Sequence, residues 1–487
     1  MDKSRTIFGN EMSENVYRKA VCTKEKFVRK YGDDAGKYYP LSAVPAPVIG
    51  ESLGVRKLVI SQKQPVQFND KSLVIGNIRM GFGHYRISMA MASAAHAMGY
   101  DPYWFDLNSF ENSTCGKVIA GQNDLYSLGS RLSQQSKLFN KLVWEPLNSE
   151  GFRKLSYNAV DQKTAELMVP VYQELPKDIP FIACHVWCSQ AAVHAGMTKV
   201  VNAIPDNWPM ALHLSEGAIH TVQTPSTYLG YRVLRGMDKK RDLLPMPRTA
   251  IAYTGHYVDH ELVKNLESDC RKRVERAKHG EARRWLMSVG GAGAQREIFV
   301  AIIHKLLPQI RAGRAVLFIN VGDHRNVWNE LLAEIPEMYR FVTEHFNDSG
   351  ETARFCEEIY DGTANGIHVF YHNDIFAAVY STNLLMRVSD VLITKPSELS
   401  FYPIPKLMIQ RVGGHEAWGA IRASELGDGS YECSSLRETS AMLSLMQKNG
   451  DVIEKMCVAI RHCHDQGIYN GAYRAVKLAV EGWKKSE

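Results

Sequence analysis

The chain has 487 residues, of which 45% are hydrophobic and 23% charged, with a formal net charge of +6. This length exceeds what one ordinary hydrophobic core supports, so we expect two domains of mixed α/β type. Basic and acidic residues interleave along most of the chain, which argues against a nucleic-acid binder, and the apolar runs are too short to span a membrane.

The cysteines and the N-terminal region indicate the compartment. Nine cysteines are scattered along the chain, and no apolar run resembling a secretion signal stands near the start. We therefore expect a cytoplasmic protein. The basic segment 18–30 has apolar residues at helical spacing, which is typical either of a solvated helix packed on the protein or of a peripheral contact with the inner membrane face.

The order of apolar runs predicts two alternating series of strands and helices. Residues 1–70 contain no repeating unit and are interpreted as an N-terminal extension. The first domain, 71–250, has candidate strands at 73–78, 103–107, 180–183, 199–203 and 220–223. The second domain, 251–487, has candidate strands at 285–289, 315–321, 367–370, 391–394 and 406–410, with helices at 296–310 and 375–380. Such alternation predicts two Rossmann-like domains facing an interdomain cleft, with the last helix a candidate to pack back on the first domain.

A glycine-rich turn, Gly81–His84, follows the first strand of the first domain and opens a helix. Such a turn can bring a polar group to a helix N-terminus, where phosphates or catalytic side chains lie. We expect His84 to face the cleft, although an ordinary capping or core histidine is the alternative. The segment Val201–Pro209 places Asp206 after another strand, either as a functional carboxylate or as a turn residue.

Two further segments lie at strand ends in the second domain. Met287–Gln295 ends a strand with small residues, where backbone amides could approach a diphosphate closely. Ile393–Leu399 offers Lys395, a hydroxyl at Ser397 and a carboxylate at Glu398. Its structural alternative is a turn in which Ser397 caps a helix.

These segments, in the same order, resemble the diacylglycerol glycosyltransferases, which include the monogalactosyldiacylglycerol synthases, and more distantly the peptidoglycan N-acetylglucosaminyltransferase. The similar segments are Gly81–His84, Val201–Pro209, Tyr253–Gly255, Val289–Gly293, Ile393–Pro396, Gly414–Glu416 with Gly419, and Leu426–Gly429. The resemblance covers about residues 72 to 430.

The resemblance implies the GT-B fold and inverting transfer of a hexose from a nucleoside diphosphate sugar, usually a UDP-sugar, without a metal or other cofactor. His84 and Asp206 would be catalytic, with His84 as general base, and Gly81, Gly83 and Trp208 would lie on the acceptor side. The donor-binding candidates are Gly291, Gly293, Gln295, His372, Lys395, Ser397, Glu398, Gly414, His415 and Glu416. The expected partners are a nucleotide-sugar donor and a lipid or small-molecule acceptor.

Other interpretations stay open from the sequence. A sugar-nucleotide epimerase or hydrolase would need the same donor site but no acceptor pocket. A non-catalytic sugar-nucleotide-binding scaffold is the other alternative, because the segment Pro396–Glu398 is shorter than in the family. Cys184–Cys188 invites a metal interpretation, yet no second ligand pair at zinc spacing accompanies it. The sugar, the base, the acceptor and the oligomeric state are not determined by the sequence.

Overall fold

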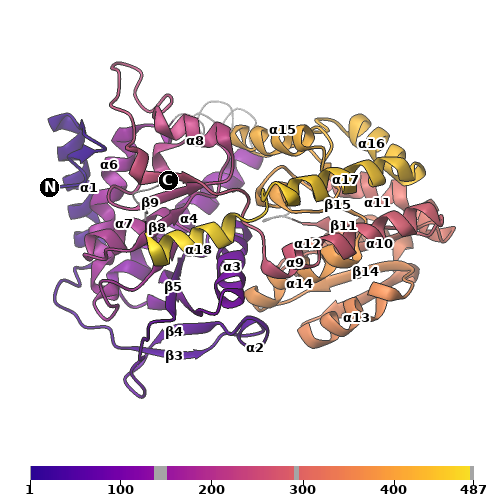
Figure 1. Ribbon diagram of the computed structural model, residues 1–487, viewed down its shortest axis with the longest axis horizontal. Helices are drawn as coiled ribbons and strands as arrows, with labels where there is room; N and C mark the ends of the chain where they lie inside the picture. The colour runs from indigo at the N-terminus through magenta and orange to yellow at the C-terminus, as the bar shows by residue number, and fades with distance from the viewer. Residues whose placement is uncertain (1, 136–150, 290–294, 483–487) are drawn as a thin grey trace.

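The fold consists of two α/β halves, each built on its own sheet (Figure 1). This arrangement comes from a computed structural model that describes residues 2–135, 151–289 and 295–482. The first sheet has eight strands in the order β10-β9-β8-β7-β5-β6-β4-β3, and the second has six in the order β13-β14-β12-β11-β15-β16. All neighbouring strands in both sheets are parallel except β3 and β4.

The first half contains a small antiparallel pair, the eight-stranded sheet and its helices. Its strands are β1 (Thr6–Ile7), β2 (Asn10–Glu11), β3 (Leu41–Pro45), β4 (Arg56–Ile60), β5 (Ser72–Asn77), β6 (Asp101–Asp106), β7 (Phe181–Ala183), β8 (Val200–Ala203), β9 (Ile219–Val222) and β10 (Ile251–Tyr253). Its helices are α1 (Glu14–Tyr31), α2 (Ile49–Leu53), α3 (Phe82–Ala97), α4 (Thr114–Gln135), α6 (Leu155–Ala165), α7 (Val186–His194) and α8 (Pro225–Arg232).

The second half contains the six-stranded sheet and the remaining helices. Its strands are β11 (Arg283–Ser288), β12 (Ala315–Asn320), β13 (Val342–Phe346), β14 (Gly366–Tyr371), β15 (Val391–Thr394) and β16 (Lys406–Met408). The helices are α9 (His260–Lys264), α10 (Leu266–Lys278), α11 (Arg296–Arg311), α12 (Arg325–Glu334), α13 (Ser349–Asp361), α14 (Ile375–Val388), α15 (Ala417–Leu426), α16 (Leu436–Lys448), α17 (Gly450–Asp465) and α18 (Gly471–Glu481). The last of these, α18, packs against α3 of the first half (Figure 1).

The central strand β5 is buried along its length because both faces of the sheet are covered. Leu73 and Ile75 belong to the core that α3 and α18 close on one face, while Val74 belongs to the core with Phe105 and Phe181 on the other. Burial on both faces explains why this strand appears in the sequence as a continuous apolar run and not as an alternating one.

All ten strands expected from the sequence are present, and three corrections concern the strands outside that set. Strands β3 and β4 come from the residues interpreted as an extension, yet they complete the first sheet. Strand β10 lies beyond residue 250, in the range assigned to the second domain, but it pairs with β9 in the first sheet. Strand β13 was not expected, because only its His345 is fully buried and the segment is mostly polar.

The carboxyl ends of the two sheets face each other through direct contacts. Arg79, which follows β5, forms an ion pair with Asp323, which follows β12. The Phe82 ring at the start of α3 lies 5.5 Å from the His324 ring. Ligands of open parallel sheets bind outside these strand ends. Two Rossmann-like domains with facing carboxyl edges constitute the GT-B fold, as expected.

A fully buried ion pair holds α15 against the second sheet. The Lys406 ammonium on β16 lies 2.9 Å from the Asp428 carboxylate, just past the end of α15, and neither side chain is exposed. The Tyr469 hydroxyl donates to the same carboxylate at 2.8 Å. The pair fixes the end of α15, the helix whose start carries His415 and Glu416.

Removal of one partner of this buried pair should be costly, because the other charge is left uncompensated. We expect Asp428→Asn to lower the free energy of unfolding by about 3–5 kcal/mol. The control is Glu454→Gln, since Glu454 pairs with Lys278 at an exposed site, where the loss should stay below about 1 kcal/mol. Urea unfolding of both variants measures this difference, and equal losses would show that burial does not strengthen the pair.

Candidate active site

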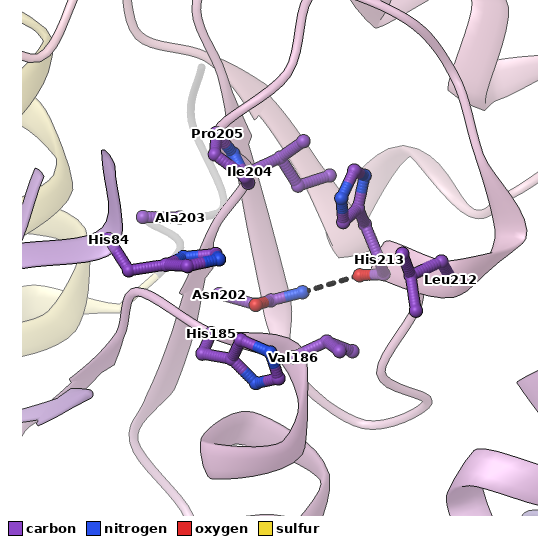
Figure 2. A pocket seen from close by; sticks show the side chains of 9 residues that line it. All are labelled: His84, His185, Val186, Asn202, Ala203, Ile204, Pro205, Leu212 and His213. Carbon is purple, nitrogen blue, oxygen red and sulfur yellow. Dashed lines mark hydrogen bonds between the residues drawn. The ribbon is translucent and has the colours of Figure 1, made fainter. Parts of the chain in front are cut away.

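A small pocket lies at the carboxyl ends of β5, β7 and β8. Its volume is about 40 Å³, which is room for about three water molecules. Figure 2 shows the rings of His84, His185 and His213 around Asn202, whose side-chain amide donates to the His213 carbonyl at 2.7 Å. The full lining consists of His84, His185, Val186, Asn202, Ala203, Ile204, Pro205, Leu212 and His213.

The protonation of His84 follows from its hydrogen bond. Gly81 precedes α3 with a φ of 95°, a conformation that favours glycine, and His84 therefore stands in the first turn of the helix. Its Nδ1 lies 2.7 Å from the Cys184 carbonyl oxygen. A carbonyl can only accept, so Nδ1 carries the proton and Nε2 keeps its lone pair. Burial lowers the pKa of His84, and the Cys184 carbonyl and the Asp206 charge oppose this shift only in part.

His185 has the complementary protonation. The Trp187 N–H donates to His185 Nδ1 at 3.2 Å as the N-terminal cap of α7, so the neutral ring carries its proton on Nε2. Burial, aided by electrostatic interaction with the neighbouring His84 and His213 rings, holds the pKa of His185 well below its ordinary value. The His84 and His185 rings meet edge to face at 4.9 Å. The pocket thus presents one histidine acceptor beside one histidine donor.

Asp206 lies in the loop after β8 and pairs with a different histidine. Its Oδ2 lies 3.3 Å from His213 Nε2, and His213 Nδ1 lies 2.9 Å from the Tyr231 hydroxyl. Burial raises the pKa of Asp206, but the His213 hydrogen bond and the charges of His415 and His213 outweigh it and hold the pKa well below its usual range. The sequence suggested Asp206 as the partner of the His84 ring. The structure gives that place to the Cys184 carbonyl, because the β7–α7 turn lies directly beside α3.

In the second domain, Glu416 organises the loop before α15. Its carboxylate accepts from the N–H groups of Val412 at 2.8 Å and Gly413 at 3.2 Å, and it forms an ion pair with Lys395. Burial raises the pKa of Glu416, but the Lys395 charge and these hydrogen bonds lower it by more than burial raises it. The pKa of Glu416 is therefore below its ordinary value. Gly414 and His415 form the short 3₁₀ turn that leads into the helix. The structure therefore brings Lys395, Gly414, His415 and Glu416 together.

Glu398 lies against the first domain. Its Oε1 is 3.8 Å from Nε of Arg86, a buried residue of α3. A Cβ added to Gly83 would lie 3.3 Å from Glu398 Oε2, so this glycine leaves room for the carboxylate. Ser397 occupies the cap position before the 3₁₀ turn Glu398–Phe401, but its side chain makes no capping hydrogen bond. The Glu398 side chain thus connects the second domain to the first.

The other candidates are placed less directly. His372 is buried, with its Nε2 3.3 Å from the Thr352 hydroxyl within the second domain, and burial lowers the pKa of His372. Gln295 donates from its side chain to the Gln410 carbonyl. Trp208 lies beside Trp418 of α15, with ring centres 5.7 Å apart. Gly291 and Gly293 lie outside the described residues.

Sequence reasoning missed His185, His213 and Tyr231 as neighbours of the site. The available signal for His185 was its position directly after a strand, which places it at the same sheet edge as His84. Cys184 and Cys188 are buried free thiols. Within the described ranges, no group of three or more His, Cys, Asp or Glu side chains is arranged to hold a metal ion. None of the described helices is both long and apolar enough to cross a membrane.

Comparison with known proteins gives two family matches. Residues 6–233 match a family model described as Domain of unknown function (DUF6937), and residues 246–480 match a second, described as Domain of unknown function (DUF6938). No curated protein matches the chain. The two family matches meet between β9 and β10, in the segment that connects α8 to the last strand of the first sheet.

Solved structures similar to this chain share little sequence with it. A UDP-GlcNAc 2-epimerase from Neisseria meningitidis is 12% identical, with 84% of this chain and 98% of that chain covered and a TM-score of 0.44. An α,α-trehalose 6-phosphate synthase from Burkholderia multivorans is 11% identical, with 84% and 98% covered and a TM-score of 0.42. A glycosyltransferase from Rickettsia africae is 12% identical, with 86% and 100% covered and a TM-score of 0.41.

The neutral state of His185 predicts how the free energy of unfolding changes with pH. The unfolded chain binds a proton at this ring below its ordinary pKa of 6.5, whereas the folded protein does not, so acid favours unfolding. His185→Asn keeps a capping oxygen for the Trp187 N–H and removes the titrating group. Relative to this variant, the wild type should lose about 1.4 kcal/mol of unfolding free energy for each pH unit below 6.5. Urea unfolding at about pH 7.5 and pH 5 tests this, and a constant offset between the two proteins would contradict it.

Proposed function

We propose that the protein is a glycosyltransferase that moves a hexose from a nucleoside diphosphate sugar, with a UDP-sugar as the expected donor, to the hydroxyl of an acceptor. The observation that carries the proposal is the unprotonated Nε2 of His84, which lines a pocket at the carboxyl edge of the first sheet. A neutral histidine acceptor at this position has the protonation that a general base needs.

The proposed reaction proceeds with inversion at the anomeric carbon. The acceptor oxygen forms a bond to this carbon as the bond to the diphosphate oxygen breaks, and the acceptor proton passes to His84 Nε2. The electron pair of the broken bond leaves with the nucleoside diphosphate. His185 Nε2–H would orient the acceptor oxygen by donating a hydrogen bond, and Asp206 would stabilise the imidazolium through its charge, because its own hydrogen bond goes to His213.

The donor would bind on the second domain, at the strand ends that face this pocket. The proposed contacts of the diphosphate and the ribose are the backbone amides near Gly414, the Lys395–Glu416 pair, and Gly291 and Gly293, which lie outside the described residues. Backbone N–H groups and a cation can neutralise a leaving diphosphate without a metal ion. Support comes from the assembly of Lys395, Gly414 and Glu416 into one loop cluster beside the first domain.

The role of His84 is tested by His84→Ala. Turnover should fall about a hundredfold or more, because general base catalysis is lost, while the affinity for UDP should change little. The control is His279→Ala, since His279 is exposed and distant in the second domain, and it should retain full turnover. Release of the nucleoside diphosphate measures the rate, and calorimetry measures the affinity. An unchanged rate in His84→Ala would remove His84 as the base.

The same assay separates the rival enzyme classes. Without acceptor, a transferase leaves the sugar nucleotide intact, an epimerase converts it into an isomer, and a hydrolase releases free sugar. A scaffold that binds sugar nucleotides would show affinity without any of these products. Product analysis by mass spectrometry and NMR in the presence and absence of acceptor therefore decides among the four.

A further inference from the structure

A buried tyrosine adjoins the histidine pocket. Tyr231 of α8 is fully buried, and its hydroxyl lies 2.9 Å from Nδ1 of His213, a pocket-lining residue. The same hydroxyl accepts from the Met210 N–H at 3.2 Å and lies 3.3 Å from the Met210 carbonyl. The other ring nitrogen of His213, Nε2, lies 3.3 Å from Asp206 Oδ2. A hydrogen-bonded chain therefore runs from Tyr231 through His213 to the Asp206 carboxylate.

This chain leaves His213 no ring nitrogen for a substrate. A carboxylate can only accept, so His213 Nε2 carries a proton and donates it to Asp206. The second ring nitrogen, Nδ1, is engaged by the Tyr231 hydroxyl. In the described part of the chain, His84 by contrast uses only its Nδ1. Although His213 lines the pocket, its contribution to the site is therefore exerted through its hydrogen-bond partners.

The Tyr231 hydroxyl fits both charge states of His213. When the ring is neutral, Nδ1 is an acceptor and the hydroxyl donates to it. When the ring is protonated, Nδ1–H donates to the hydroxyl oxygen, and the hydroxyl proton turns to the Met210 carbonyl. Neither state leaves a buried ring nitrogen unpaired, which would be unfavourable. The Nε2–H bond to Asp206 is thus kept in both states.

The backbone that carries His213 is also fixed. This residue ends the 3₁₀ turn Ala211–His213, and its carbonyl accepts from the side chain of Asn202 at 2.7 Å (Figure 2). The Asn158 amide of α6 donates to the carbonyls of Ala211 and Leu214, at 2.8 Å each. Asn158 and Asn202 are themselves buried. The imidazole is therefore anchored both at its backbone and at its two nitrogens.

Asp206 is the residue through which this chain can act on His84. Burial lowers the pKa of His84, and the Asp206 charge is among the influences that oppose this shift. The other ionisable side chains that interact with the His84 ring are His185, His213 and Glu398. Because the Coulomb energy depends on distance, a carboxylate held in place stabilises a neighbouring imidazolium more than one that moves away.

From these contacts we infer that Tyr231 and His213 are positioning residues, which act on His84 only through Asp206 by holding its carboxylate in place. This inference rests on the proposed function, because it states how the imidazolium that forms on His84 in that reaction is stabilised. Its measurement needs no substrate, since the protonation of the His84 ring is itself the readout.

The test is a double-mutant cycle on the protonation of His84. Nitrogen-15 NMR of labelled histidine rings measures the pH midpoint of His84 in the wild type, in Tyr231→Phe, in Asp206→Asn and in the double variant. Tyr231→Phe removes one hydroxyl and no charge. The matched control is Tyr228→Phe, since Tyr228 lies on the same helix and its hydroxyl accepts from Arg232 Nη1 at 3.0 Å.

Asp206→Asn should lower the His84 midpoint by about one pH unit or more, because an opposite charge is lost. Tyr231→Phe should lower the midpoint by a smaller amount, and the double variant should match Asp206→Asn alone. Tyr228→Phe should match the wild type. An unchanged midpoint in Tyr231→Phe, or a shift that persists when Asp206 is already replaced, would overturn the inference.

The wild type gives a second measurement that does not depend on the folding of a variant. Its neutral His213 ring should carry the proton on Nε2 and none on Nδ1, and the opposite tautomer would contradict the hydrogen-bonded chain. The rate of His84→Ala tests the proposed function separately. An unchanged rate there would contradict that function and the catalytic use of the chain, whereas a reduced rate without coupling in the cycle would overturn this inference alone.

Discussion

The hydrogen bond from His84 to the Cys184 carbonyl is the interaction on which the organisation of the site depends. It joins the β5–α3 turn to the β7–α7 turn, two segments 100 residues apart. Because the carbonyl can only accept, this single contact decides which ring nitrogen of His84 is unprotonated. It also brings His185 against His84. The burial of the two rings then keeps both neutral, so the pocket offers an acceptor and a donor of protons side by side.

A second set of contacts gives the pocket its surroundings in the other domain. Arg79 pairs with Asp323, Glu398 approaches Arg86, and Asn207 donates to the Trp418 carbonyl. Each contact joins a strand end or helix start of the first domain to one of the second. Charged and polar contacts therefore hold the carboxyl edges of the two sheets opposite each other. Such interfaces between domains resemble transient ones and permit relative motion, which the proposed transfer from a donor to an acceptor would need.

The sequence predicted the strands whose burial is complete and the turns that follow them, because a continuous apolar run ending in glycine is a local signal. Strands β3 and β10 were missed or misassigned because their pairing partners lie elsewhere, and three residues such as Ile251–Tyr253 carry no local preference for one sheet. His84 was identified from its turn, whereas its partner is a backbone carbonyl that has no sequence signature. The contacts of His213 with Tyr231 and Asp206 join a loop, a 3₁₀ turn and a helix, so residue spacing could not reveal them.

The protonation of His84 is the point at which the account is most directly open to measurement. Nitrogen-15 NMR of protein labelled in its histidine rings, with His84→Ala used for assignment, reports the state of each nitrogen between about pH 5 and pH 8. The account predicts that at neutral pH Nδ1 of His84 carries a proton, Nε2 carries none, and the ring becomes charged only below the ordinary histidine pKa. A proton on Nε2, or a charged ring at neutral pH, would contradict the assignment of His84 as the base.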